Sequence, residues 1–176
     1  MRIRPSPPSP SPGGRGESSP KCFGIIPPLL SGEGLGGEVN KMFRKDYIML
    51  MIEDFIKAMA KIIMMREMKS YTDARVELDG LSKLVTGFGL DHLRSLGATG
   101  IRYVFSQNKE SEAEKIYCSA RIIKEEGLIL KSQGKTEDSL KSLEIAKELF
   151  KMASEMDIPE KDEAMNEFKE LNKLLV

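Results

Sequence analysis

The chain has 176 residues, and its 27 Lys and Arg residues are balanced by 27 Asp and Glu residues. Such a balance provides no strongly basic surface, so nucleic acid is not an expected partner. No stretch approaches the roughly 20 apolar residues that a membrane-spanning helix needs, so no membrane span is expected either.

Residues 1–41 differ in composition from the rest of the chain, since they contain eight of the nine prolines and eight of the 15 glycines. Proline removes backbone donors and glycine raises the entropic cost of ordering, so this segment is expected to be a disordered tail. Its best apolar stretch, Phe23 to Leu30, is interrupted by Pro27 and Pro28 and has no cleavage site after it, which argues against a signal peptide.

The boundary at Met42 has a further interpretation. Glu38 and Val39 can be encoded GAG-GTN, which places a purine-rich box where a bacterial ribosome-binding site stands before a Met42 codon. We therefore expect translation to begin at Met42 and residues 1–41 to be an over-extended reading frame. Peptides from residues 1–41 recovered from the native protein would contradict this expectation.

Two apparent motifs fall in or at the edge of this segment. Gly32, Gly34 and Gly37 match the GxGxxG fingerprint of dinucleotide-binding proteins, but no strand pattern precedes them, so the match is attributed to chance. Cys22 is the only disulfide partner available to Cys118. With Cys22 set aside, one cysteine and no secretion signal indicate a reducing, cytoplasmic location.

The 135 residues from Met42 onward suit a single helical domain and carry a formal charge of about −2. A first helix is predicted from about Phe43 to Met68, because apolar residues recur there at helical spacing. Met49, Ile56 and Met64 extend the apolar surface beyond one face. We therefore expect this helix to be buried on two sides, and these three residues are the candidate interaction surface.

A second helix is predicted from Tyr71 to Thr86, with Ser70 as its N-cap and Gly87 at its end. The connection to the first helix is short, so the two helices should be antiparallel. The stretch 90–108 is less regular and predicts two short helices, over about 91–96 and 99–105.

Three further helices follow. Ser111 to Glu114 forms a capping-box pattern before a helix that extends to about Gln133. Thr136 is a candidate cap for the next helix, which extends to about Met156, and Pro159 lies near the start of the last one.

Small residues recur where paired helices must approach closely, at Gly127, Gly134 and Ser139. This spacing resembles a tetratricopeptide repeat, although Ser139 replaces the usual alanine and, in the first hairpin, Lys69 stands where glycine is common. The stretch from Met42 also resembles the opening of an uncharacterised bacterial family of small all-helical, tetratricopeptide-like proteins, as does EEGLILKSQGKTEDSLKSLEIAKELF later in the chain. The expected fold is all-α, with antiparallel helical hairpins; a small helical bundle is the alternative. The resemblance implies no activity.

Chemistry-bearing residues are sparse. His92 is the only histidine, and with one credible cysteine it cannot complete a closed zinc site. The acidic residues of the later helices alternate with lysines, which is typical of a solvated face, and no cofactor motif is present. His92, Arg94 and Tyr103 are the candidate polar groups of an inter-helix pocket.

The composition and helical pattern favour a cytoplasmic scaffold that binds another protein or forms a homo-oligomer. An enzyme or small-ligand-binding protein with an inter-helix pocket is the alternative. Peripheral membrane association through the Met-rich first helix is a third class, which fits less well because its apolar face is broad.

Overall fold

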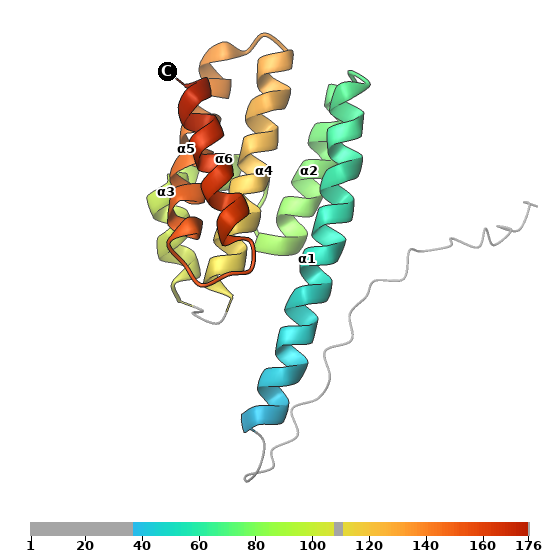
Figure 1. The fold of residues 1–176 in the computed structure, drawn as a ribbon. Helices are drawn as coiled ribbons and strands as arrows, with labels where there is room; N and C mark the ends of the chain where they lie inside the picture. The colour runs from blue at the N-terminus through green and yellow to red at the C-terminus, as the bar shows by residue number, and fades with distance from the viewer. Residues whose placement is uncertain (1–36, 108–110, 176) are drawn as a thin grey trace, which may run out of the picture. The chain divides into compact units, whose positions relative to one another are not determined.

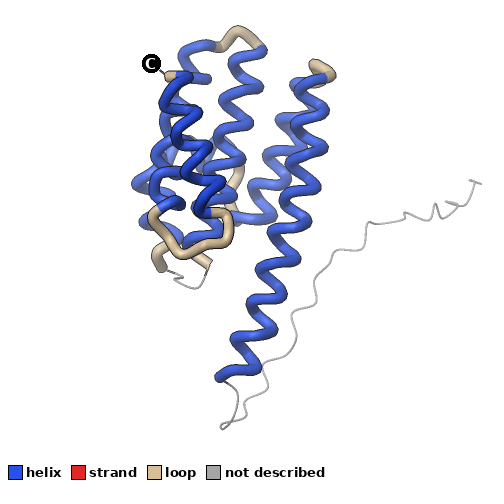
Figure 2. Tube along the Cα trace, in the orientation of Figure 1, coloured by secondary structure: helices blue, strands red, loops and turns tan. Residues whose placement is uncertain are grey.

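The computed structural model describes the backbone of residues 37–107 and 111–175, and the side chains of these ranges from residue 50 onward. These residues form six α-helices and no strand, so the all-α prediction is confirmed (Figures 1 and 2). The helices are α1 (Gly37–Glu67), α2 (Tyr71–Thr86), α3 (Leu90–Phe105), α4 (Glu112–Ser132), α5 (Thr136–Ser154) and α6 (Lys161–Leu174).

Helix α4 lies at the centre of the domain. It packs along α5 and also contacts α1, α2 and α3, while α6 packs against α5. In Figure 1, α1 and α2 lie side by side as an antiparallel pair, and α4 stands between this pair and the α5–α6 pair. Neighbours therefore cover α4 on several sides, so it needs apolar residues around most of its circumference.

The sequence of α4 meets this requirement with two apolar stripes. One contains Ile116, Ile123 and Leu130, and the other contains Ile122 and Ile129; all five are buried. Residues from the other helices complete the core, and the Tyr117 ring meets the Phe150 ring edge-on with 6.2 Å between centroids.

Small residues allow α4 and α5 to pack closely in their hairpin. The Ser139 hydroxyl donates a hydrogen bond of 2.8 Å to the Gly127 carbonyl oxygen. A Cβ atom on Gly127 would lie only 2.8 Å from Cγ and Cδ2 of Leu143. Helix α4 and helix α5 therefore approach so closely at this point that only glycine fits without displacement of Leu143.

Helix boundaries agree with the predicted ones to different degrees. Helix α2 has the predicted bounds, whereas α1 begins at Gly37 rather than near Phe43. Residues 37–41 contain no proline, so nothing in their chemistry stops the helix from extending past the change in composition at Met42. The boundary between the two units of the chain lies between Gly36 and Gly37, and the predictions made for residues 1–36 concern residues outside the described ranges.

The irregular stretch forms one element, α3, instead of two separate short helices. Gly97 interrupts its helical geometry with φ +63° and ψ 177°, so helical turns on both sides meet at a kink. The two-part prediction is therefore correct about the interruption. The structure differs from the prediction in that the element continues across Gly97.

Ser70 and Ser111 occupy the predicted N-cap positions of α2 and α4, but the side-chain capping hydrogen bonds expected there are absent. The Ser70 hydroxyl donates to the Asp73 carboxylate at 2.5 Å, and neither Ser70 nor Ser111 makes a capping hydrogen bond to the helix that follows it. Thr136 is the first residue of α5, and Lys135 occupies the cap position. At the α1–α2 turn, Lys69 has a left-handed backbone with φ +62°, the conformation that favours glycine at this position.

Candidate functional site

The predicted interaction surface on α1 is open to solvent. Ile56 is 50 % exposed and Met64 is 55 % exposed, whereas Phe55, Met59 and Ile62 on the inner side are buried. The expectation that α1 is buried on two sides is therefore wrong for the described side chains. The reason is that its neighbours α2 and α4 both pack against the inner side. Met49 precedes the described side chains.

The predicted pocket residues do not converge. A shallow groove of about 500 Å³ lies between α3 and α5, and Arg94 lines it. His92 and Tyr103 are outside this groove: the His92 ring is exposed and stacks on Phe88 with 5.1 Å between centroids, and Tyr103 is 72 % exposed. The residues that line the groove are Asp91, Arg94 and Ser95 of α3 and Asp138, Lys141, Glu144, Ile145 and Glu148 of α5.

Beside this groove lies a cluster of charges that the sequence pattern did not single out. Glu126 of α4 is fully buried, and neither of its carboxylate oxygens has a hydrogen-bond partner. Guanidinium groups from two other helices face it, with Arg75 at 3.7 Å and Arg94 at 3.8 Å from its Oε1 atom. Burial raises the pKa of Glu126 to about 7, although Arg94 and Arg75 act in the opposite direction.

The neighbouring Glu125 has a different environment. Its carboxylate pairs with the Arg66 guanidinium of α1 at 2.5 Å. The adjacent glutamates of α4 thus face three helices, α1 through Glu125 and both α2 and α3 through Glu126. On another side of α4, Arg121 and Lys124 pair with Glu163 and Glu167 of α6.

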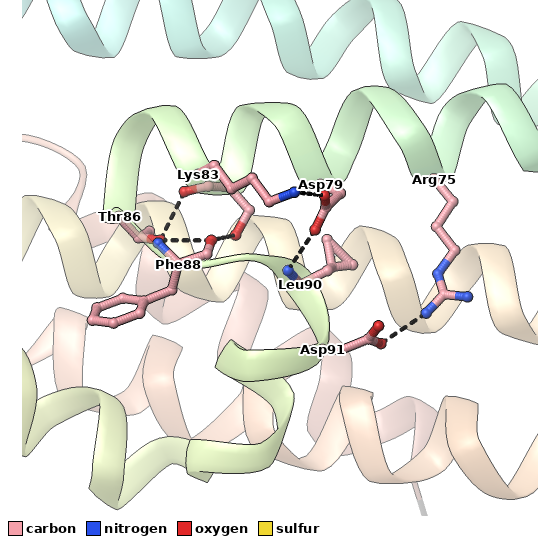
Figure 3. A network of polar contacts seen from close by, with 8 residues as sticks. Arg75, Asp79, Lys83, Thr86, Phe88, Leu90 and Asp91 are labelled. Atoms are coloured by element: carbon pink, nitrogen blue, oxygen red, sulfur yellow. Dashed lines mark hydrogen bonds and ion pairs between the residues drawn. The ribbon is translucent and has the colours of Figure 1, made fainter.

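A network at the α2–α3 corner fixes where α3 begins (Figure 3). The Leu90 N–H group, the first of α3, donates to the Asp79 carboxylate at 2.9 Å, and Lys83 pairs with the same carboxylate. The hydrogen bond from Lys83, with that from Leu90, lowers the pKa of Asp79 below its usual value. The Phe88 N–H group donates to the Thr86 hydroxyl at 3.1 Å.

This corner places the first turn of α3 against α2. Asp91 follows Leu90 directly, and its carboxylate accepts a hydrogen bond of 2.9 Å from Arg75 of α2 (Figure 3). One turn later, Arg94 faces both Asp91 and Glu126. The backbone geometry at the start of α3 therefore sets the positions of Asp91 and Arg94 in the charge cluster.

Cys118 is buried, and burial raises the pKa of its thiol to about 12, so it is not an activated nucleophile. In the described ranges, no group of three or more His, Cys, Asp or Glu side chains is arranged to hold a metal ion.

No family model, no curated protein and no solved structure matches the chain. Of the helices in the described ranges, none combines the length and the apolar character that crossing a membrane requires.

Proposed function

We propose that the protein is a cytoplasmic helical-repeat scaffold for protein–protein interaction, and that its exposed α1 face binds a second copy of the chain. The observation that carries this proposal is the exposure of Ile56 and Met64 on one side of α1, with the small, exposed Ala60 between them. Exposed apolar side chains on one helix face are typical of interaction sites, and a small residue lets a partner helix approach closely.

The charges of α1 favour a second copy as the partner. Glu53 and Asp54 precede Ile56, and Lys57 and Lys61 follow it. Within one chain, Lys57 pairs with Asp54, and Lys61 pairs with Glu77 of α2. In two copies of α1 paired antiparallel about Lys57, Glu53 of one copy would lie near Lys61 of the other. Such pairs add little affinity on an exposed surface, but they select the antiparallel orientation.

The repeat-like part of the proposal is supported by the hairpins. The close approach at Gly127 and the left-handed backbone at Lys69 are the local features that the tetratricopeptide resemblance implies at these positions. The central position of α4, which also contacts α3, is a departure from a regular repeat array, in which each unit contacts only its neighbours.

Sedimentation velocity over a range of protein concentrations tests this function. We expect a reversible dimer, and we expect the double variant Ile56→Lys/Met64→Lys to be monomeric with an unchanged circular dichroism spectrum. The matched control is Val76→Lys/Leu84→Lys, because these α2 residues are 68 % and 82 % exposed and lie outside the proposed surface. A wild-type protein that stays monomeric at the highest concentration would refute self-association, and equal disruption by the control would refute the assigned surface.

A second candidate function is the binding of a small charged ligand in the α3–α5 groove. Its supporting observation is the presence of Arg94 and Lys141 in the groove wall. The groove wall also contains four acidic residues, which outnumber these two cations, so the groove does not favour an anionic ligand. They are Asp91, Asp138, Glu144 and Glu148. Self-association is therefore the better-supported function.

A further inference from the structure

Two carboxylates share the same two guanidinium groups at the junction of α2, α3 and α4. Arg75 lies 2.9 Å from Asp91 and 3.7 Å from Glu126. Arg94 lies 3.5 Å from Asp91 and 3.8 Å from Glu126. Both guanidiniums are thus closer to Asp91, and both are within a short side-chain movement of Glu126.

The two carboxylates differ in their access to solvent. The Asp91 side chain is 76 % exposed, so water can solvate its charge when no cation is near. The Glu126 side chain is fully buried and makes no hydrogen bond, unlike Glu125, which pairs closely with Arg66. An ionised carboxylate in such a place is unfavourable unless a cation comes into direct contact with it, whereas a protonated one needs no cation.

We propose that Asp91 and Glu126 compete for these two guanidinium groups, and that a proton on Glu126 decides which carboxylate holds them. With Glu126 protonated, Arg75 and Arg94 stay with Asp91, which is the arrangement in the structure. Loss of the proton draws both guanidiniums by about 1 Å into direct hydrogen bonds with Glu126. Asp91 is then left to solvent.

All neighbouring elements contribute to this equilibrium. Arg66 of α1 is engaged by Glu125, Arg75 comes from α2, and Asp91 and Arg94 come from α3. Asp138 of α5 adds a negative charge that opposes ionisation of Glu126, as Asp91 does.

The exchange has a consequence for the groove between α3 and α5. Arg94 is one of two cations in the groove wall, and its movement toward Glu126 removes positive charge from that wall. The remaining wall is dominated by the acidic residues Asp91, Asp138, Glu144 and Glu148. The charge that the groove presents to solvent therefore becomes more negative when Glu126 loses its proton. This exchange of guanidinium partners does not depend on the proposed self-association through α1.

Nuclear magnetic resonance of the full chain between about pH 5.5 and 8.5 tests the proposal. Every protein carries His92→Asn, because histidine ordinarily titrates in this range. We expect the guanidinium Nε–H signals of Arg75 and Arg94 to shift with a common midpoint near pH 7. In Glu126→Gln, a neutral variant of the same shape, these shifts should vanish. A midpoint below about pH 5.5, or equal shifts in the Gln variant, would overturn the proposal.

Two further variants separate competition from simple burial of a carboxyl group. Asp91→Asn removes the competing carboxylate, so the midpoint should fall. Arg94→Gln removes one cation, so the midpoint should rise by about one pH unit. Midpoints that stay unchanged in both variants, or that move in the same direction, would show that the guanidiniums are not shared.

Discussion

Replacement of Gly127 by alanine probes the closest contact in the domain. The new Cβ would lie 2.8 Å from Cγ and Cδ2 of Leu143, and 3.4 Å from its backbone nitrogen. Carbon atoms in favourable contact are about 3.5–4.0 Å apart, so the overlap approaches 1 Å. Leu143 is buried and cannot turn away into solvent, so the side chain or the whole of α5 must shift.

The expected loss follows from three contributions. Overpacking of a core contact costs about 1–3 kcal/mol. Separation of the helices also weakens the hydrogen bond between Ser139 and Gly127, which contributes about 1 kcal/mol. Alanine is about 1 kcal/mol better than glycine in a helix, which offsets part of this. Gly127→Ala should therefore lower the free energy of unfolding by about 1–3 kcal/mol.

Urea unfolding followed by circular dichroism measures this change. Gly80→Ala is the matched control, because Gly80 is also helical but nothing lies within 4 Å of a Cβ placed there. The control should raise stability by about 0.5–1 kcal/mol. Leu143→Ala in the Gly127→Ala background should couple favourably in a double-mutant cycle. If Gly127→Ala stabilises the protein as Gly80→Ala does, then α4 and α5 do not approach each other as closely as described at Gly127.

Three other substitutions test separate features by the same unfolding assay. Lys69→Gly should raise stability by about 1 kcal/mol, because it removes the penalty for a left-handed backbone at φ +62°; no gain would contradict that conformation. Asp79→Ala should lower stability by about 1 kcal/mol, because the Leu90 N–H group loses its acceptor. Since folding lowers the pKa of Asp79, the stability difference between wild type and variant should shrink as the solution is acidified through that pKa. Folding raises the pKa of Glu126 from 4.5 to about 7, so its contribution to stability is fully present below pH 4.5 and is lost as the pH rises through about 7. The free energy of unfolding should therefore fall by about 3 kcal/mol over this range because of this residue. Glu126→Gln should remove this fall, and a pH profile that Glu126→Gln leaves unchanged would refute the assignment.

The parts of the fold that were predictable are those that depend on local sequence. The bounds of α2 follow from its apolar spacing and from Gly87, whose left-handed backbone at φ +83° ends the helix. The α4–α5 hairpin follows from Gly127 and Gly134, because the close helix packing leaves no room for a Cβ atom and a left-handed turn favours glycine. These features depend on residues within one hairpin, so their spacing in the chain was sufficient.

The charge cluster depends on contacts between distant parts of the chain and was not predictable in this way. Glu126 follows Glu125 in a helix with many charges, and an isolated glutamate is almost never fully buried. A signal was nevertheless present, since Glu126 lies in line with Ile122 and Ile129 on the second apolar stripe of α4. That stripe becomes informative only once α2 and α3 are known to cover it.

The candidate interaction surface shows the opposite case. Ile56 and Met64 were singled out because they widen an apolar face, and that pattern is equally compatible with an internal contact or an external one. The positions of α2 and α4 leave both side chains exposed. The pattern of a single helix does not identify the molecule that binds to this surface.

The central position of α4 limits how this chain can be shortened. A tandem array tolerates deletion of a hairpin, since each unit is covered only by its neighbours. Here α1, α2, α3 and α5 all rest on one helix, so a fragment that ends before Glu112 would leave Phe55, Leu78 and Leu93 without their cover. The helices before α4 therefore depend on it for part of their cover, and we expect removal of α4 to destabilise them, although their sequence resembles that of a separate module.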